Sequence, residues 1–332
     1  GNDDPSAALQ LHQSIVRFEP DWEKYEATRS YARVLKTVKL NGEASATKAA
    51  FESNLNVLQS CMDLLSIQDE KPIQWVLTLF YDIIREDSSC MSIFEEALKH
   101  QIGVYKPLMM LLSRHKLDTY VADKSAWLLS AIIGHVPGSF TQDDVAALLR
   151  QLLAKEQHCT ELGVLEAVTN LLKSDTFRVC VWSCPGVADC ILKVQAKSSS
   201  APFQYRSVFA LWMLSFDDQI MTDLQSRGVI KTIKDILIFT RTEKVIRLCL
   251  TVLKNFMSNK ALSEDVVEEG ILEAVQSLEF EKWRDAELYD EIRDMATHIS
   301  TEVNAMSNFE RYERELHTGT LSWGFIHSTK FW

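Results

Sequence analysis

The chain has 332 residues, 46% hydrophobic and 24% charged, which is typical of a globular protein long enough for one large core or an extended array. Its formal net charge of −11 argues against a nucleic-acid-binding protein, which needs a basic face to neutralise phosphates. Only 11 glycines and 7 prolines interrupt the chain, and this scarcity of helix breakers favours helices.

The first residues carry no recognisable targeting signal. GNDDPSAALQLHQ lacks the basic and apolar regions of a secretory signal peptide, and no window is long and uncharged enough to span a bilayer. We therefore expect a cytoplasmic protein with seven reduced cysteines and no direct membrane insertion.

Helical patterns follow at 73–98 and 123–135. Their spacing is irregular, as is usual for the terminal units of a solenoid, a fold built from stacked helical repeats.

A repeated pattern becomes regular in the second half of the chain. Five similar segments begin with a glycine, at Gly103, Gly163, Gly186, Gly228 and Gly270. The last three glycines are evenly spaced, because 228 minus 186 and 270 minus 228 both give 42. Leu172, Leu214 and Phe256 each end an apolar helix 14 residues before one of these glycines. The unit is therefore a long helix, a short connection, a glycine suited to a tight corner, and another amphipathic helix.

The period indicates the kind of repeat. Periods of about 40–47 residues with two or three helices per unit are those of HEAT and armadillo repeats. We therefore predict an all-α fold, a right-handed superhelical solenoid of HEAT/armadillo-type repeats. The repeats are expected to be irregular up to about residue 140 and regular over about 160–280.

One helix of this array carries two apolar faces. In FQYRSVFALWMLSF, residues 203–216, a second stripe recurs at i, i+4, i+7 and i+11 and consists of Tyr205, Phe209, Trp212 and Phe216. The last helix of an armadillo-type repeat lines the concave surface, so this stripe is expected to face a groove and to bind a partner. Alternatively, neighbouring helices or the chain's own termini cover it. The self-segment that we expect there lies around Phe18 and Trp22.

The same face of the next repeat is polar. A shift of one period places Arg247, Thr251, Lys254 and Ser258 at the four aromatic positions. In the repeat before the stripe, the residues that correspond to Trp212 and Phe216 are Asn170 and Ser174. The predicted groove residues are therefore Tyr205, Phe209, Trp212, Phe216, Arg247, Thr251, Lys254 and Asn255.

No pattern in the sequence predicts catalysis, because P-loop, GxGxxG, HExxH and GxSxG sequences are absent. The best metal candidate consists of Cys180, Cys184 and Cys190, with His158 and Cys159 upstream. Its spacing is not that of a zinc site, so structural cysteines are the better interpretation. We predict no enzyme activity, no metal and no cofactor. The acidic stretch at 261–294 is either a solvated helix face or a docking patch for a basic partner.

The end of the chain carries the most specific resemblance. YERELHTGTLSWGFIHSTKFW, residues 312–332, closely resembles the ELxxGxLxWxxxHxxxxFW segment of the H subunits of vacuolar-type proton-pumping ATPases. The matching positions are Glu315, Leu316, Gly319, Leu321, Trp323, His327, Phe331 and Trp332. EKVIRLCLTVLKNFM, YRSVFALWMLSF and IQWVLTLFYDIIRED are similar to helices of the same family, so the resemblance covers roughly residues 70–332. The chain departs from the family pattern at Gly324, where proline is common, and at Lys254, where arginine precedes the asparagine.

The resemblance implies a non-catalytic protein with a regulatory or scaffold role. Members of this family contact the peripheral stalk, made of the E and G subunits, and the cytosolic ATP-hydrolysing sector, at the cytosolic face of vacuolar and endosomal membranes. The resemblance implies that the chain permits ATP-driven proton transport and organelle acidification, and that it is not a homo-oligomer. We expect a repeat domain at 1–315 and a linker at 316–332, towards a C-terminal domain that the chain lacks and with which silencing of hydrolysis is associated. The expected linker anchors are Trp323, His327, Phe331 and Trp332.

An armadillo-type cargo or endocytic adaptor is the alternative function. Nuclear-import armadillo proteins hold basic peptides with Trp and Asn side chains in a WxxxN spacing. Here Trp127 is followed four residues later by Ala131, and Trp212 by Phe216, so the asparagine ladder is missing. This absence favours the role in the proton-pumping ATPase.

Overall fold

The computed structural model describes residues 5–305 and 316–317, and all the regular secondary structure in these ranges is helical. The chain divides into two compact units, Gly1–Lys193 and Val194–Trp332. The helices of the first unit are α1(Pro5–Arg17), α2(Glu26–Arg29), α3(Ala32–Leu35), α4(Ala44–Ser53), α5(Leu55–Leu64), α6(Glu70–Glu86), η1(Ser88–Met91), α7(Ser92–Lys99), α8(Tyr105–Leu112), α9(Thr119–His135), η2(Pro137–Ser139), α10(Gln142–Leu152), α11(Glu161–Leu172), α12(Asp175–Ser183) and α13(Val187–Leu192). Those of the second unit are α14(Ala201–Leu214), α15(Asp218–Ser226), α16(Val229–Phe239), α17(Glu243–Phe256), α18(Lys260–Glu268), α19(Ile271–Leu278) and α20(Ala286–Ala305).

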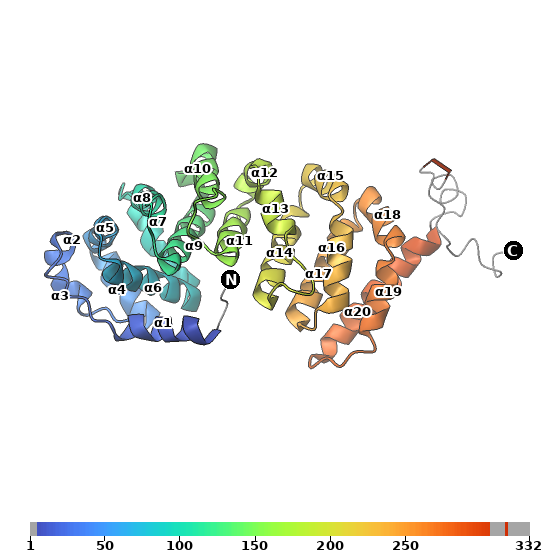
Figure 1. The fold of residues 1–332 in the computed structure, drawn as a ribbon, viewed down its shortest axis with the longest axis horizontal. Coiled ribbons are helices and arrows are strands. Elements are labelled where there is room, and N and C mark those ends of the chain that lie inside the picture. The colour runs from blue at the N-terminus through green and yellow to red at the C-terminus, as the bar shows by residue number, and fades with distance from the viewer. Residues whose placement is uncertain (1–4, 306–315, 318–332) are drawn as a thin grey trace. The chain divides into compact units, whose positions relative to one another are not determined.

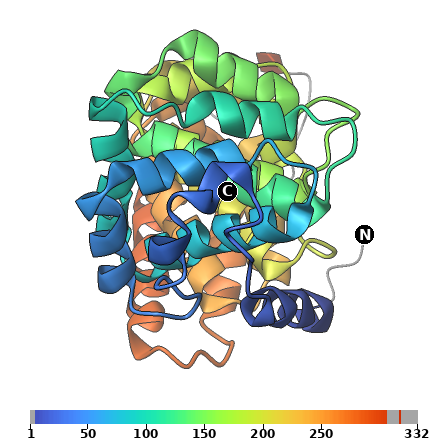
Figure 2. The ribbon, with the colours of Figure 1, turned by 90° about the vertical axis from the view of Figure 1, so that its left-hand side faces the viewer.

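In the first unit, the long helices α6, α9 and α11 pack one beside the next. The amphipathic helix α1, in dark blue near the lower edge of Figure 2, packs against α6. There His12 Nε2 lies 3.1 Å from Asp82 Oδ2.

The segment after α1 packs on the same helix. Trp22 is 2% exposed, and its ring meets that of Trp75 edge-on at a centroid distance of 5.1 Å. Lys71 Nζ lies 5.9 Å from the Phe18 ring centroid. Within the first unit, α6 thus offers an apolar partner to Trp22 and a cationic one to Phe18. That these two residues cover the aromatic stripe at 205–216 stays a prediction.

In the second unit, α14, α17 and α20 lie side by side, α15 lies beside α18, and α16 lies beside α19 (Figure 1). Each repeat thus contributes one helix to each of three rows. The core within α14 and α17 is fully buried, as at Val208, Leu211 and Val252.

The predicted glycine corners are confirmed at the three evenly spaced positions. Gly186, Gly228 and Gly270 have φ values of 89°, 67° and 66° and directly precede α13, α16 and α19. This left-handed backbone region strains residues that carry a Cβ atom, so the corners select glycine. Gly163 differs, because it lies inside α11 and its missing Cβ leaves room for the carboxylate of Asp123.

The second marker of the repeat is also confirmed. Leu172, Leu214 and Phe256 are the last residues of α11, α14 and α17, and all three are 0% exposed. Each therefore closes the apolar face of its helix at the point where the chain turns into the next one.

Candidate partner-binding surface

Helix α14 forms because its start is well defined and its interior is apolar. The Ser200 hydroxyl accepts a hydrogen bond from the Phe203 amide at 3.4 Å, and Pro202 occupies the first turn, where its missing N–H costs nothing. Val208 and Leu211 bury one face completely. The other face is left to the aromatic residues.

These aromatic residues form one continuous ladder along the helix, consisting of Tyr205, Phe209, Trp212 and Phe216. The first two rings stack at a centroid distance of 6.0 Å and an interplanar angle of 8°. Phe209 and Trp212 follow at 5.6 Å and 26°, and Trp212 meets Phe216 edge-on at 5.3 Å and 80°. Such contacts between rings hold the side chains in fixed orientations.

The aromatic ladder is only partly covered. Its first three rings are half-buried, whereas Phe216 is 57% exposed. The structure therefore brings the four predicted aromatic residues together on one accessible face. Tryptophan and tyrosine are among the residues that most often dominate protein–protein binding energies.

The four predicted residues of α17 do not share one role. Arg247 forms ion pairs with Asp285 at 2.8 Å and with Glu291 at 3.0 Å. Thr251 is exposed and donates a hydrogen bond to the Arg247 carbonyl oxygen at 2.9 Å. Lys254 is exposed, so Thr251 and Lys254 extend the accessible surface, whereas Arg247 links α17 to the start and first turns of α20.

Asn255 binds the neighbouring helix. Its Nδ2 donates a hydrogen bond to the hydroxyl of Ser215, the residue that follows α14, at 2.8 Å. In the first unit, Asn170 of α11 donates in the same way to the Ser130 hydroxyl of α9 at 3.2 Å, and each pair spans 40 residues. In the sequence, the only signal of this contact is that both pairs have the same Ser–Asn spacing of 40 residues, which no known motif describes.

We expect the Ser215–Asn255 bond to contribute about 1 kcal/mol to stability, the usual net value for a hydrogen bond between neutral side chains. Urea unfolding of Ser215→Ala, Asn255→Ala and the double variant, compared as a double-mutant cycle, gives this coupling energy. A coupling near zero would show that the bond contributes nothing to the packing of α14 on α17.

The predicted linker anchors Trp323, His327, Phe331 and Trp332 lie outside the described residues.

Within the described ranges, no three His, Cys, Asp or Glu side chains are placed to hold a metal ion together. Cys180, Cys184 and Cys190 are free thiols, and burial raises the pKa of each. Across the helices that the structure describes, none has both the length and the apolar character needed to traverse a bilayer.

Solved structures with a similar fold are armadillo-repeat proteins. Designed armadillo repeat protein YIII(Dq)4CqI matches with a TM-score of 0.55 and 16% identity, over 73% of this chain and 99% of its own. A second design, YIII(Dq.V1)4CPAF in complex with peptide (KR)4, matches with a TM-score of 0.56 and 17% identity, over 73% of this chain and 99% of its own. These similarities bear on the fold alone, and they confirm the predicted all-α architecture of armadillo-type repeats.

Sequence relatives identify the family. The V-type proton ATPase H subunit of Dictyostelium discoideum is 26% identical over 267 residues, which are 78% of this chain and 60% of the relative. A probable V-type proton ATPase H subunit of Caenorhabditis elegans is 25% identical over 350 residues, or 98% of this chain and 74% of the relative. The chain thus matches less than two thirds of the length of the Dictyostelium protein. The family described as the V-ATPase H subunit matches residues 8–299, so the chain belongs to the V-ATPase H subunit family.

Proposed function

We propose that this chain acts as a non-catalytic regulatory and scaffold component of a V-ATPase. It docks on the peripheral stalk, made of the E and G subunits, and on the cytosolic ATP-hydrolysing sector, and so permits ATP-driven proton transport and organelle acidification. This role places it at the cytosolic face of vacuolar and endosomal membranes. Membership of the V-ATPase H subunit family supports the proposal, as does the armadillo-type fold, whose stacked helices offer extended binding surfaces.

The aromatic ladder is the observation that supports this location of the docking surface. Tyr205, Phe209 and Trp212 are half-buried and in ring contact, so binding orders few additional side-chain torsions. Thr251 and Lys254 supply a polar rim on α17, the neighbouring helix. An apolar centre with a polar rim is the usual anatomy of a protein–protein interface. The linker anchors at Trp323, His327, Phe331 and Trp332 are a further proposal from the sequence.

Calorimetric titration of the chain with purified E–G heterodimer tests this function. We expect saturable binding, and Trp212→Ala should weaken it about tenfold or more, because a tryptophan in the centre of an interface is a frequent hot spot. Phe280→Ala is the matched control, since Phe280 is aromatic, belongs to the second unit and is 89% exposed outside the ladder. This control should bind like the wild type.

Two results would contradict the proposal. Absence of binding by the folded wild-type chain would refute docking on the stalk through this chain. Unchanged affinity of Trp212→Ala, with circular dichroism identical to that of the wild type, would instead refute the aromatic ladder as the docking surface.

The cargo-adaptor alternative is less well supported. Such proteins need free asparagine amides to hold a peptide backbone. Here the Asn170 and Asn255 amides donate to Ser130 and Ser215 and tie helices together. These two asparagine amides are therefore already engaged within the chain.

A further inference from the structure

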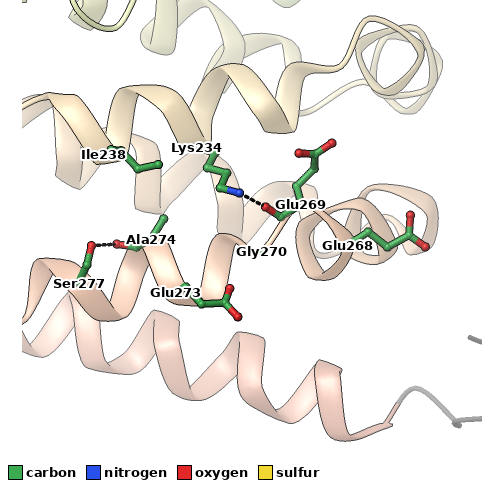
Figure 3. Close-up of a pocket in the computed structure, with 8 residues that line it drawn as sticks. All are labelled: Lys234, Ile238, Glu268, Glu269, Gly270, Glu273, Ala274 and Ser277. Carbon is green, nitrogen blue, oxygen red and sulfur yellow. Dashed lines mark hydrogen bonds between the residues drawn. The ribbon is translucent and has the colours of Figure 1, made fainter. Parts of the chain in front are cut away.

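A second surface feature lies between α16 and α19, two neighbouring helices of the second unit. It is a hollow of about 520 Å³, open to solvent. Figure 3 shows its lining residues, which are Lys234, Ile238, Glu268, Glu269, Gly270, Glu273, Ala274 and Ser277. They come from α16, from the end of α18, from α19 and from the corner that joins α18 to α19.

The glycine corner builds one end of this hollow. Gly270 adopts a φ of 66°, and the Lys234 ammonium donates a hydrogen bond to the preceding carbonyl, that of Glu269. A Cβ atom at position 270 would lie 3.0 Å from Glu273 Oε2 and 3.6 Å from Lys234 Nζ. The corner therefore brings the Lys234 ammonium and the Glu273 carboxylate close to one backbone position.

The hollow is negatively charged at its rim. Three glutamates and one lysine line it, and the lysine ammonium is hydrogen-bonded to a backbone carbonyl. Glu268, Glu269 and Glu273 are all exposed residues that line the hollow (Figure 3). A cation that approaches this edge meets an excess of negative charge.

The floor of the hollow is apolar. Ile238 is a large apolar side chain that is 37% exposed, and Ala274 of α19 faces it across the hollow. Arginine and lysine side chains combine an apolar stem with a charged end, and they bury the stem on apolar surface while the charge stays near water or an anion. An apolar floor beneath an acidic rim is complementary to a side chain of this kind.

We propose that the hollow between α16 and α19 docks a basic segment of another protein, with the stem of one arginine or lysine on Ile238 and its charge at Glu269 and Glu273. The chain's net charge of −11 assists the approach of such a segment over longer distances. The same charge disfavours nucleic acid and anionic lipid as occupants. The inference depends on neither the aromatic ladder nor the V-ATPase role, so its failure leaves the proposed function untouched.

The test measures binding of a fluorescein-labelled octapeptide of alternating lysine and arginine by fluorescence anisotropy. We expect saturable binding that weakens as salt is added. Glu269→Gln combined with Glu273→Gln should weaken binding about fivefold, as expected for two partly exposed charges that face a cation. The matched control combines Glu287→Gln with Asp290→Asn on α20, which changes the net charge equally at residues that do not line the hollow, and it should bind within about twofold of the wild type.

A charge-neutral variant distinguishes entry into the hollow from general attraction. Ile238→Ser should weaken binding about threefold without changing its salt dependence, because it removes apolar contact and no charge. All the substituted residues are accessible to solvent, so the variants are expected to fold, and circular dichroism is the check on folding. Equal loss of affinity in both charge-matched double variants would overturn the proposal, as would unchanged affinity of Ile238→Ser.

Discussion

Replacing Gly134 by alanine should destabilise the chain by about 3 kcal/mol, although alanine is the better helix former by about 1 kcal/mol. Gly134 lies in the last turn of α9, where that helix crosses close to α11. A Cβ atom there would overlap the Asn170 carbonyl oxygen and lie 3.3 Å from its carbonyl carbon. Both atoms belong to the backbone, so relief requires the helices to move apart rather than a side chain to rotate.

Urea unfolding, followed by circular dichroism at 222 nm, measures this effect. Gly103→Ala and Gly138→Ala are the controls, because a Cβ atom at either position would meet nothing within 4 Å. Both controls should lie within about 0.5 kcal/mol of the wild type. If Gly134→Ala were as stable as these controls, the close approach of α9 to α11 would not depend on the glycine.

Replacing Asp123 by asparagine should remove a pH-dependent contribution of about 2 kcal/mol to stability. The Asp123 carboxylate accepts hydrogen bonds from the amide and the hydroxyl of Thr160, each at 2.8 Å, and so joins α9 to the start of α11. Burial raises the pKa of Asp123 to about 6, and the two hydrogen bonds from Thr160 offset only part of that rise. The carboxylate is therefore a costly charge at neutral pH.

The direction of the pH effect follows from this raised pKa. Between about pH 4 and pH 6 the native carboxyl holds its proton more tightly than the unfolded one, so the native state binds more protons. The contribution of Asp123 to stability is therefore largest below about pH 4 and is lost as the pH rises through about 6. In Asp123→Asn this dependence is absent, because the amide does not titrate in that range.

Unfolding free energies of both proteins at pH 4, 5, 6 and 7 measure the effect as a difference, which cancels the titration of all other groups. The stability of the wild type relative to Asp123→Asn should fall by about 2 kcal/mol from pH 4 to pH 7. Asp189→Asn is the control, since Asp189 is exposed in the same unit. A relative stability that did not change with pH would mean that the native environment leaves the Asp123 carboxyl as it is in the unfolded chain.

The sequence by itself determined the features that depend on local periodicity. The 42-residue spacing identified the left-handed corners at Gly186, Gly228 and Gly270, because only glycine meets such a backbone conformation without strain. The spacing of the aromatic residues in 203–216 identified the ladder, because residues three and four positions apart share a helix face. The family also followed from the sequence by resemblance, and the family match over residues 8–299 bears out that assignment.

Only the tertiary structure decided which of these side chains are engaged within the chain. Asn255 and Arg247 share a predicted face with exposed residues, yet Asn255 binds Ser215 and Arg247 binds Asp285, about 40 residues away in each case. Trp22 packs on Trp75, 53 residues away, and the hollow at Ile238 exists because two repeats bring α16 beside α19. Helical periodicity fixes the direction in which a side chain points around the helix axis. The residue that this side chain contacts depends on how the repeats stack. The stacking is set by contacts between residues far apart in sequence.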